Sequence, residues 1–78
     1  MKVTIYSTPL CSWCKKTKEF FSKHKVKYKD INVAADQKAA HEMIEKSGQQ
    51  GVPVIDIDGK IVIGFDELKL RKLLKITG

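Results

Sequence analysis

The chain has 78 residues, the size of one small domain covering residues 1–78, and 42% of them are apolar. This apolar content is enough for one core and excludes a disordered chain. No stretch approaches the roughly 20 apolar residues that a membrane-spanning helix needs, and no signal-peptide pattern follows the N-terminus. We therefore expect a cytoplasmic, monomeric protein without a membrane partner.

The charge is unevenly distributed. Fifteen Lys and Arg against nine Asp and Glu give a net charge of +6, and seven lysines lie between Lys15 and Lys29. Such a face attracts nucleic acid or an acidic protein, but it is equally typical of a solvated helix surface. Arg71 is the only arginine, and no aromatic residues alternate with the lysines. We therefore favour the solvated surface and expect no nucleic-acid partner.

The first half of the chain predicts strand, helix and strand. Residues 2–6 alternate between polar and β-branched apolar side chains, which is typical of a buried strand. A break at residues 7–10 precedes a helix from Ser12 to about His24. The inward side of this helix should carry Trp13, Thr17, Phe20 and Phe21. After the helix, residues 26–33 predict a second strand.

The second half predicts helix, hairpin and helix. A helix should run over residues 34–46 and stop at Ser47-Gly48. Residues 52–57 and 60–63 predict two strands, and the Asp58-Gly59 pair between them is a strong hairpin signal. Asp66 should cap a last helix from Glu67 to about Ile76. Its apolar side should carry Leu68, Leu70, Leu73, Leu74 and Ile76.

The predicted order βαβαββα defines an α/β fold. The first two strands must be parallel because a helix connects them by a right-handed crossover, and the closing hairpin adds antiparallel strands. A four-stranded mixed sheet flanked by three helices satisfies this order. In such a sheet, the loop after the first strand and the loop before Pro53 can meet at one end.

Cys11 and Cys14 are the only cysteines, and they stand where the first strand gives way to a helix. Free amides at a helix N-terminus stabilise a thiolate, which is the reactive form of cysteine. Cys11 should be the more exposed and more acidic thiol, whereas Cys14 should lie inside the first turn. This arrangement favours thiol–disulfide exchange, with Cys11 attacking and Cys14 resolving the mixed disulfide.

A metal site is the competing interpretation of two cysteines at this spacing. A structural zinc ion needs four ligands, and only His24 and His41 remain as further candidates. Neither has zinc-knuckle spacing to the cysteines, so we expect both to be surface histidines and no metal to be held within the chain. A metal or iron–sulfur cluster carrier that shares Cys11 between two subunits stays open as the alternative function.

Three further positions have both a functional and a structural interpretation. Pro53 can simply start a strand, or a cis bond to Val52 can turn the Val52 backbone toward an extended peptide beside Cys11. Gly64-Phe65-Asp66 can be a helix start alone, or it can bind a ligand's carboxylate and ammonium groups. Trp13 can shield the thiols or pack against a partner, or it can be an exposed aromatic residue without a special role.

These motifs together resemble those of the glutaredoxins over nearly the whole chain. The residues that carry the resemblance are Thr8-Pro9-Leu10-Cys11-Ser12-Trp13-Cys14-Lys15-Lys16, Gly51-Val52-Pro53-Val54 and Gly64-Phe65-Asp66-Glu67. The resemblance implies a thioredoxin-like fold, a cis bond before Pro53, Cys11 as nucleophile and Cys14 as resolving thiol. It also implies that Val52 pairs with the glutathione backbone and that Gly64, Phe65 and Asp66 hold the γ-glutamyl end.

The chain also departs from the glutaredoxin pattern. Ser12-Trp13 replaces the usual Pro-Tyr, Thr8 replaces a lysine that binds the glycyl carboxylate of glutathione, and Ile63 replaces the first of two glycines. These differences weaken the glutathione pocket. They make the chain similar to small glutaredoxin-like redoxins, some of which serve ribonucleotide reductase and take electrons from thioredoxin reductase.

We therefore expect a dithiol–disulfide oxidoreductase without a bound cofactor. Its substrates would be protein disulfides, with ribonucleotide reductase among the candidates, or glutathione mixed disulfides. Its electron donor would be glutathione or a flavoprotein such as thioredoxin reductase.

Overall fold

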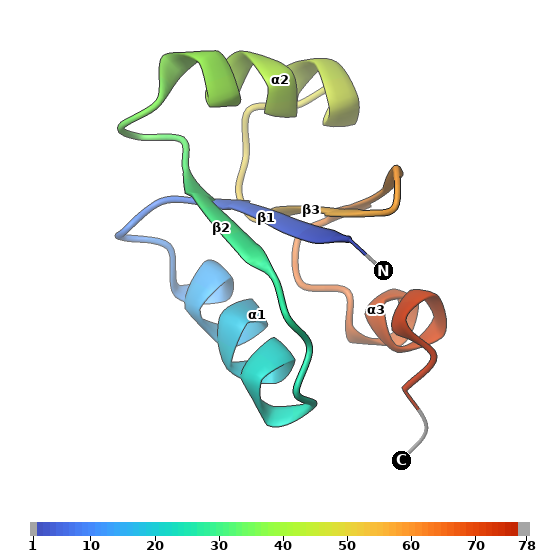
Figure 1. Cartoon of the computed structure of the whole chain (residues 1–78). Helices are drawn as coiled ribbons and strands as arrows, with labels where there is room; N and C mark the ends of the chain where they lie inside the picture. The colour runs from blue at the N-terminus through green and yellow to red at the C-terminus, as the bar shows by residue number, and fades with distance from the viewer. Residues whose placement is uncertain (1, 77–78) are drawn as a thin grey trace.

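The computed structural model describes residues 2–76. Its four strands form one sheet in the order β2-β1-β3-β4, in which β1 and β2 are parallel and the other pairs are antiparallel. Figure 1 shows α2 on one face of this sheet and α1 and α3 on the other. The predicted mixed sheet with three helices is confirmed. The elements are β1 (Val3–Ser7), α1 (Ser12–Lys23), β2 (Lys29–Asn32), α2 (Gln37–Ser47), β3 (Val54–Ile57), β4 (Lys60–Ile63) and α3 (Glu67–Leu74).

The central strands β1 and β3 are buried on both faces, and their alternating side chains form two cores. Ile5 and its partner Ile55 face α1 and α3, whereas the neighbouring pair Tyr6 and Val54 faces α2. This alternation follows from the two-residue period of a strand. The larger core contains Val3, Ile5, Phe20, Phe21, Ile55, Ile57, Val62 and Leu70. The smaller one contains Tyr6, Ala39, Met43 and Val54.

Several element boundaries differ from the prediction. β1 covers residues 3–7 rather than 2–6, and β3 starts at Val54 rather than residue 52. β2 starts at Lys29 rather than residue 26, because the Val26 amide donates to the Phe21 carbonyl at the end of α1 (2.8 Å) instead of entering the sheet. α2 starts at Gln37 rather than residue 34, because Asp36 caps it. α3 ends at Leu74 rather than Ile76, since Lys75 adopts a left-handed conformation with φ 55°.

Three side chains lie elsewhere than predicted. Trp13 was expected on the inward side of α1 but is 56% exposed, and Leu68 was expected on the apolar side of α3 but is 80% exposed. Both residues lie in the first turn of their helix, whereas the core side chains Phe20, Phe21 and Leu70 come from later positions of α1 and α3. His24 was expected on the surface, but its ring packs 4.5 Å from the Phe20 ring and its buried Nε2 atom has no hydrogen-bond partner among residues 2–76.

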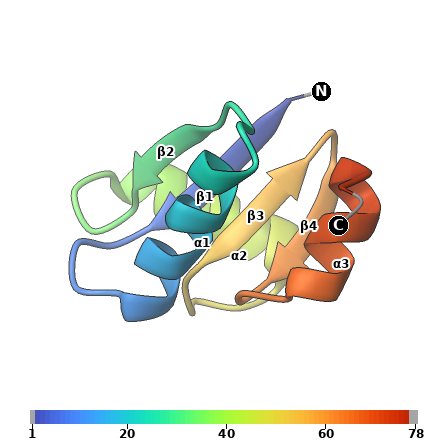
Figure 2. The same ribbon diagram turned by 90° about the horizontal axis from the view of Figure 1, so that it is seen from below.

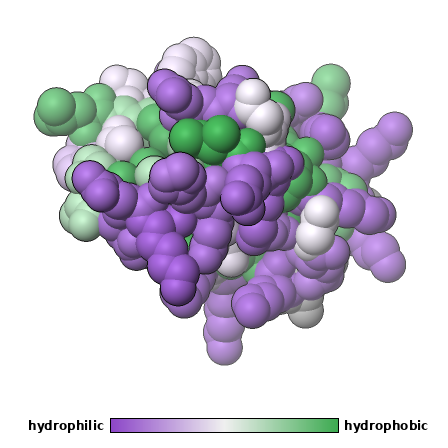
Figure 3. Space-filling view, turned by 90° about the horizontal axis from the view of Figure 1, so that it is seen from above, coloured by the Kyte–Doolittle hydropathy of each residue, from purple (hydrophilic) through white to green (hydrophobic). Residues whose placement is uncertain are grey.

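The segments that enter α1, β3 and α3 lie at one end of the sheet (Figure 2). This arrangement brings the cysteine loop and the loop before Pro53 together, as the predicted topology allowed, and adds the turn at Gly64 and Phe65. Seen from the α2 side, most of the surface is hydrophilic (Figure 3). Within residues 2–76, no helix has both the length and the apolar character that crossing a membrane requires.

Candidate active site

Cys11 is the N-cap residue of α1. Its backbone is extended (φ −92°, ψ 110°), and its Sγ atom accepts a hydrogen bond from the Cys14 amide at 3.1 Å. The amides of the first turn of a helix have no carbonyl partners within the helix, so a side chain at the N-cap satisfies one of them. A thiolate is a stronger hydrogen-bond acceptor than a thiol, so an amide in this position favours the thiolate form of a reduced cysteine.

The two cysteines are joined by a disulfide, and their Cα atoms are 5.2 Å apart. Cys14 is 1% exposed and points into the protein, whereas Cys11 is partly exposed. An incoming molecule can therefore reach the sulfur of Cys11 but not that of Cys14. The predicted difference in exposure between the two thiols is confirmed.

The loop before β3 lies directly against this disulfide. The Val52–Pro53 peptide bond is cis, as the family resemblance implied. The carbonyl oxygen of Val52 lies 3.9 Å from the Sγ atom of Cys11, and Pro53 itself is buried. The Pro53 carbonyl accepts a hydrogen bond from the Gly64 amide at 2.9 Å, which ties this loop to the end of β4.

A cavity of about 230 Å³ lies beside the disulfide. The centres of the Trp13 and Phe65 rings, which both line it, are 6.3 Å apart, and the Lys16 ammonium lies 4.7 Å from the centre of the Trp13 ring. Gly64 has φ 75°, a conformation that glycine adopts without strain. The lining residues are Trp13, Val52, Pro53, Gly64 and Phe65.

Asp66 is the one predicted binding residue that does not line this cavity. Its carboxylate caps α3 by accepting a hydrogen bond from the Lys69 amide at 3.2 Å. This contact is the structural role that the sequence pattern allowed. Asp66 instead borders a second groove, on the outside of α3.

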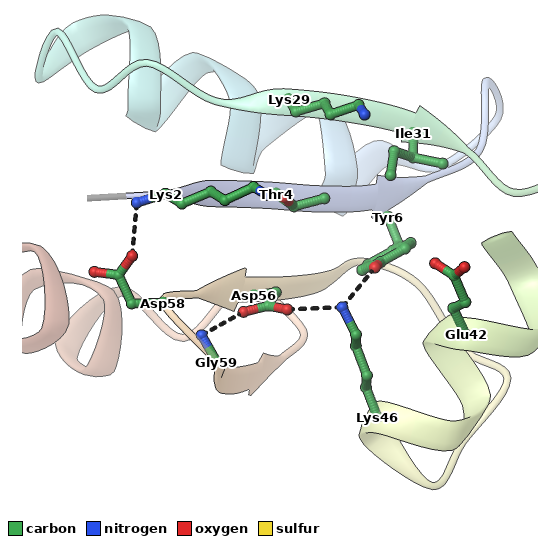
Figure 4. A pocket seen from close by; sticks show the side chains of 10 residues that line it. All are labelled: Lys2, Thr4, Tyr6, Lys29, Ile31, Glu42, Lys46, Asp56, Asp58 and Gly59. Atoms are coloured by element: carbon green, nitrogen blue, oxygen red, sulfur yellow. Dashed lines mark hydrogen bonds and ion pairs between the residues drawn. The ribbon is translucent and has the colours of Figure 1, made fainter.

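A polar cluster that was not predicted from the sequence lies on the α2 side of the sheet (Figure 4). The Lys46 ammonium donates to the Tyr6 hydroxyl at 3.1 Å and to the Asp56 carboxylate at 2.9 Å. Burial by itself raises the pKa of Asp56, but hydrogen bonds from Lys46 and the Gly59 amide outweigh it and lower that pKa. The same hydrogen bonds to Asp56 and Tyr6 raise the pKa of Lys46. No local pattern signals this cluster, because Tyr6 and Lys46 are 40 residues apart.

A second ionic contact links β2 to α1. The Lys18 ammonium lies 2.6 Å from the Asp30 carboxylate, which also accepts from the Ser7 hydroxyl at 2.7 Å. Burial raises the pKa of Asp30, but these two hydrogen bonds outweigh it and lower that pKa. Within residues 2–76, no group of three or more His, Cys, Asp and Glu residues could hold a metal ion.

Comparison with known proteins agrees with this geometry. The protein-family model described as Glutaredoxin matches residues 3–62. A glutaredoxin-like 8.6 kDa protein from the rubredoxin operon of Clostridium pasteurianum is 49% identical over 73 residues, which cover 94% of this chain and 97% of that protein. The glutaredoxin-like protein NrdH of Lactococcus lactis is 34% identical over 71 residues, covering 91% and 97% of the two chains.

Solved structures show the same fold. A threonine-to-alanine mutant of the thioredoxin-like protein BC3987 superposes with a TM-score of 0.92 at 33% identity, covering 97% of each chain. The four-stranded mixed sheet is therefore a thioredoxin-like fold, and the cysteine pair at the start of α1 is that of a thiol–disulfide oxidoreductase. The family match, the relatives and the fold agree that this chain belongs to the glutaredoxin family.

Proposed function

We propose that the protein reduces disulfides of other proteins, and mixed disulfides with glutathione, with Cys11 as the attacking thiolate and Cys14 as the resolving thiol. One observation carries the proposal: the partly exposed sulfur of Cys11 caps α1 and is bonded to the buried sulfur of Cys14. The exposed sulfur is the one that a substrate can reach. The buried sulfur is the one that can return to it.

The reaction balances without a bound cofactor. The Cys11 thiolate attacks one sulfur of the substrate disulfide, forms a Cys11–substrate disulfide and releases the other substrate sulfur as a thiolate. The Cys14 thiolate then attacks the Sγ atom of Cys11 and displaces the second substrate sulfur. Two electrons pass to the substrate, whose sulfurs take up two protons, and the protein is left with the Cys11–Cys14 disulfide.

The cavity beside the disulfide would align the substrate. Val52 would pair through its backbone with the residues flanking the substrate cysteine, since its carbonyl lies 3.9 Å from the Cys11 sulfur. Trp13 and Phe65 would border the groove in which the substrate chain lies. Gly64 and Phe65 in the cavity lining, with Asp66 next to them in the chain, would hold the γ-glutamyl end when the substrate carries glutathione.

We propose thioredoxin reductase as the main electron donor, glutathione as the weaker one, and ribonucleotide reductase as a candidate protein substrate. Thr8 offers no positive charge to a glycyl carboxylate, which favours a protein donor over glutathione. The similarity to NrdH of Lactococcus lactis is in line with this choice. A cytoplasmic location suits the proposal, because that compartment keeps thiols reduced.

The test compares the two donors directly. Oxidised protein is mixed with NADPH and thioredoxin reductase, or with NADPH, glutathione and glutathione reductase, and NADPH consumption is followed with a protein disulfide as the final acceptor. We expect faster turnover with thioredoxin reductase. The Thr8→Lys variant should raise the rate with glutathione and leave the other rate unchanged. Equal rates for both donors, or turnover by neither, would contradict the proposal.

A further inference from the structure

The outer side of α3 carries a groove of about 740 Å³, and apart from Asp66 none of its lining residues takes part in the proposed chemistry. Its apolar part consists of Leu68, which is 80% exposed, and the half-buried Ile76. The other leucines of α3 pack toward the sheet. We call this region the α3 groove. It is lined by Asp66, Leu68, Lys69, Arg71, Lys72, Lys75 and Ile76.

The charges around the α3 groove are nearly all positive. Four of its seven lining residues are cations and only Asp66 is acidic. Asp66 accepts the Lys69 amide, and Arg71 pairs with Glu67 at 3.0 Å. Within residues 2–76, neither Lys72 nor Lys75 forms an ion pair, so the positive potential of the groove is not neutralised by the protein itself.

The α3 groove and the candidate active site are linked through the chain itself. Phe65, which lines the cavity beside the disulfide, directly precedes Asp66, which lines the groove. The groove thus begins at the residue that follows the cavity lining in the sequence. The eight residues of α3 span about 12 Å, a length that about four residues of an extended peptide cover.

We propose that the α3 groove binds an acidic segment of the disulfide-bearing substrate protein, with an apolar side chain on Leu68 and carboxylates on Lys72 and Lys75. The inference rests on the proposed function and names its substrate class. Charge complementarity favours such a peptide. A membrane surface requires a broader apolar face than Leu68 and Ile76 provide, and a single-stranded nucleic acid requires aromatic platforms, which the lining of the groove lacks.

The test uses two synthetic peptides that share one disulfide and differ only in a short tail. One tail contains Glu, Asp and Leu, and in the other Gln and Asn replace the acids. Prereduced protein is mixed with excess peptide, and the second-order rate constant of a single turnover is measured at low and high salt. This format needs no reductase, so docking of a donor protein cannot affect the result.

The variant Lys72→Glu/Lys75→Glu has a closely matched control in Lys23→Glu/Lys25→Glu. Lys23 and Lys72 lie in the last turns of α1 and α3, and Lys25 and Lys75 both adopt positive φ. All four side chains are exposed, so the two variants change the net charge and the helix ends alike. A third variant, Leu68→Ser, removes the apolar contact without changing charge.

We expect the wild type to reduce the acidic-tailed peptide about tenfold faster than the neutral one at low salt, with the advantage lost at high salt. Lys72→Glu/Lys75→Glu should abolish this preference and Lys23→Glu/Lys25→Glu should keep it. Leu68→Ser should reduce the rate about fivefold for the acidic-tailed peptide alone. All variants should reduce a small aromatic disulfide at the wild-type rate.

Equal rates for the two tails in the wild type would overturn the inference, as would equal loss of preference in both charge-reversed variants. It would also be overturned if the Lys72→Glu/Lys75→Glu variant lost binding to anionic vesicles or an oligonucleotide while treating the two peptides as the wild type does. If the wild type failed to reduce even the small disulfide, the proposed function itself would be wrong. The two failures are thus distinguishable.

Discussion

The helices α1 and α2 begin with the same hydrogen-bond geometry but with different acceptor atoms. The Cys11 sulfur accepts from the Cys14 amide at 3.1 Å, and the Asp36 carboxylate accepts from the Ala39 amide at 3.1 Å. A carboxylate oxygen does not attack disulfides, so the cap at Asp36 contributes only to stability. A cysteine at the same place can change protonation state, so the same amides favour its reactive form.

Their surroundings also differ. Asp36 lies on the exposed approach to α2, whereas Cys11 lies against Val52 and beside the cavity lined by Trp13 and Phe65. A helix cap becomes a candidate catalytic group when its acceptor atom is a nucleophile and a second chain segment stands beside it. The comparison predicts that replacing the capping atom of α1 removes activity without lowering stability. Removing the cap of α2 should lower stability without changing activity.

The largest effect is expected for Cys11→Asp, which gives α1 the cap that α2 already has. The carboxylate still accepts the Cys14 amide, so the thermal midpoint of unfolding of the reduced protein should be unchanged or higher. Disulfide reduction should fall about a thousandfold or more, because the nucleophile is gone. Turbidity of reduced insulin measures the activity, and circular dichroism measures the unfolding.

The matched control is Cys14→Ser, which keeps the attacking sulfur and removes the resolving one. It should accumulate a mixed disulfide with its substrate that mass spectrometry detects. An active Cys11→Asp variant would show that the cap atom is not the nucleophile.

The next effect concerns the acidity of the cap sulfur. In reduced Cys14→Ser, the rate of alkylation of Cys11 by iodoacetamide should rise with a pKa below the value of about 8.5 for free cysteine, because the amide at position 14 stabilises the thiolate. The same protein in denaturant provides the reference. A midpoint equal to the denatured value would mean that the helix start does not activate the sulfur.

A smaller effect is expected when the α2 cap is removed. Asp36→Ala leaves the Ala39 amide without its side-chain acceptor and should reduce the free energy of unfolding by about 1 kcal/mol. Disulfide reduction should be unchanged, since α2 lies on the opposite face of the sheet from α1. Asp36→Ser, which restores a capping oxygen, should recover most of the stability. A loss of activity in Asp36→Ala would link the α2 cap to the chemistry.

The smallest effect is expected from the polar cluster beneath α2. The pKa of Asp56 is lowered in the folded protein, so its contribution to stability is present above the unfolded value of about 3.9 and is lost as the pH falls through the folded pKa. In Asp56→Asn, the free energy of unfolding should therefore decrease less as the pH falls from 7 to 2. Near pH 7, the substitution should lower the free energy of unfolding by about 0.2–1 kcal/mol, as for other solvent-accessible ion pairs. Denaturant unfolding from pH 2 to pH 7 measures both.

Local patterns in the sequence were sufficient for the elements and their order. The Asp58-Gly59 turn, the start of α1 at Ser12, the cap at Asp66 and the stop at Gly48 are all observed where they were predicted, because each depends on neighbouring residues only. The cysteine spacing likewise predicted an exposed sulfur at Cys11. The exposure of Leu68 and Trp13 was predicted wrongly, because helical periodicity defines a face but not how far the sheet beneath it extends.

The amino-acid sequence by itself thus determined which residues form strands and helices and where a reactive sulfur meets a helix start, since these depend on contacts within a few residues. Only the tertiary structure decided that the Val52 carbonyl lies 3.9 Å from a sulfur 41 residues away, and that Lys46 pairs with both Asp56 and Tyr6. It also decided that cations of α3 and an exposed leucine line one groove. Distances between segments remote in the chain follow from how helices pack on the sheet, and that packing has no local signature.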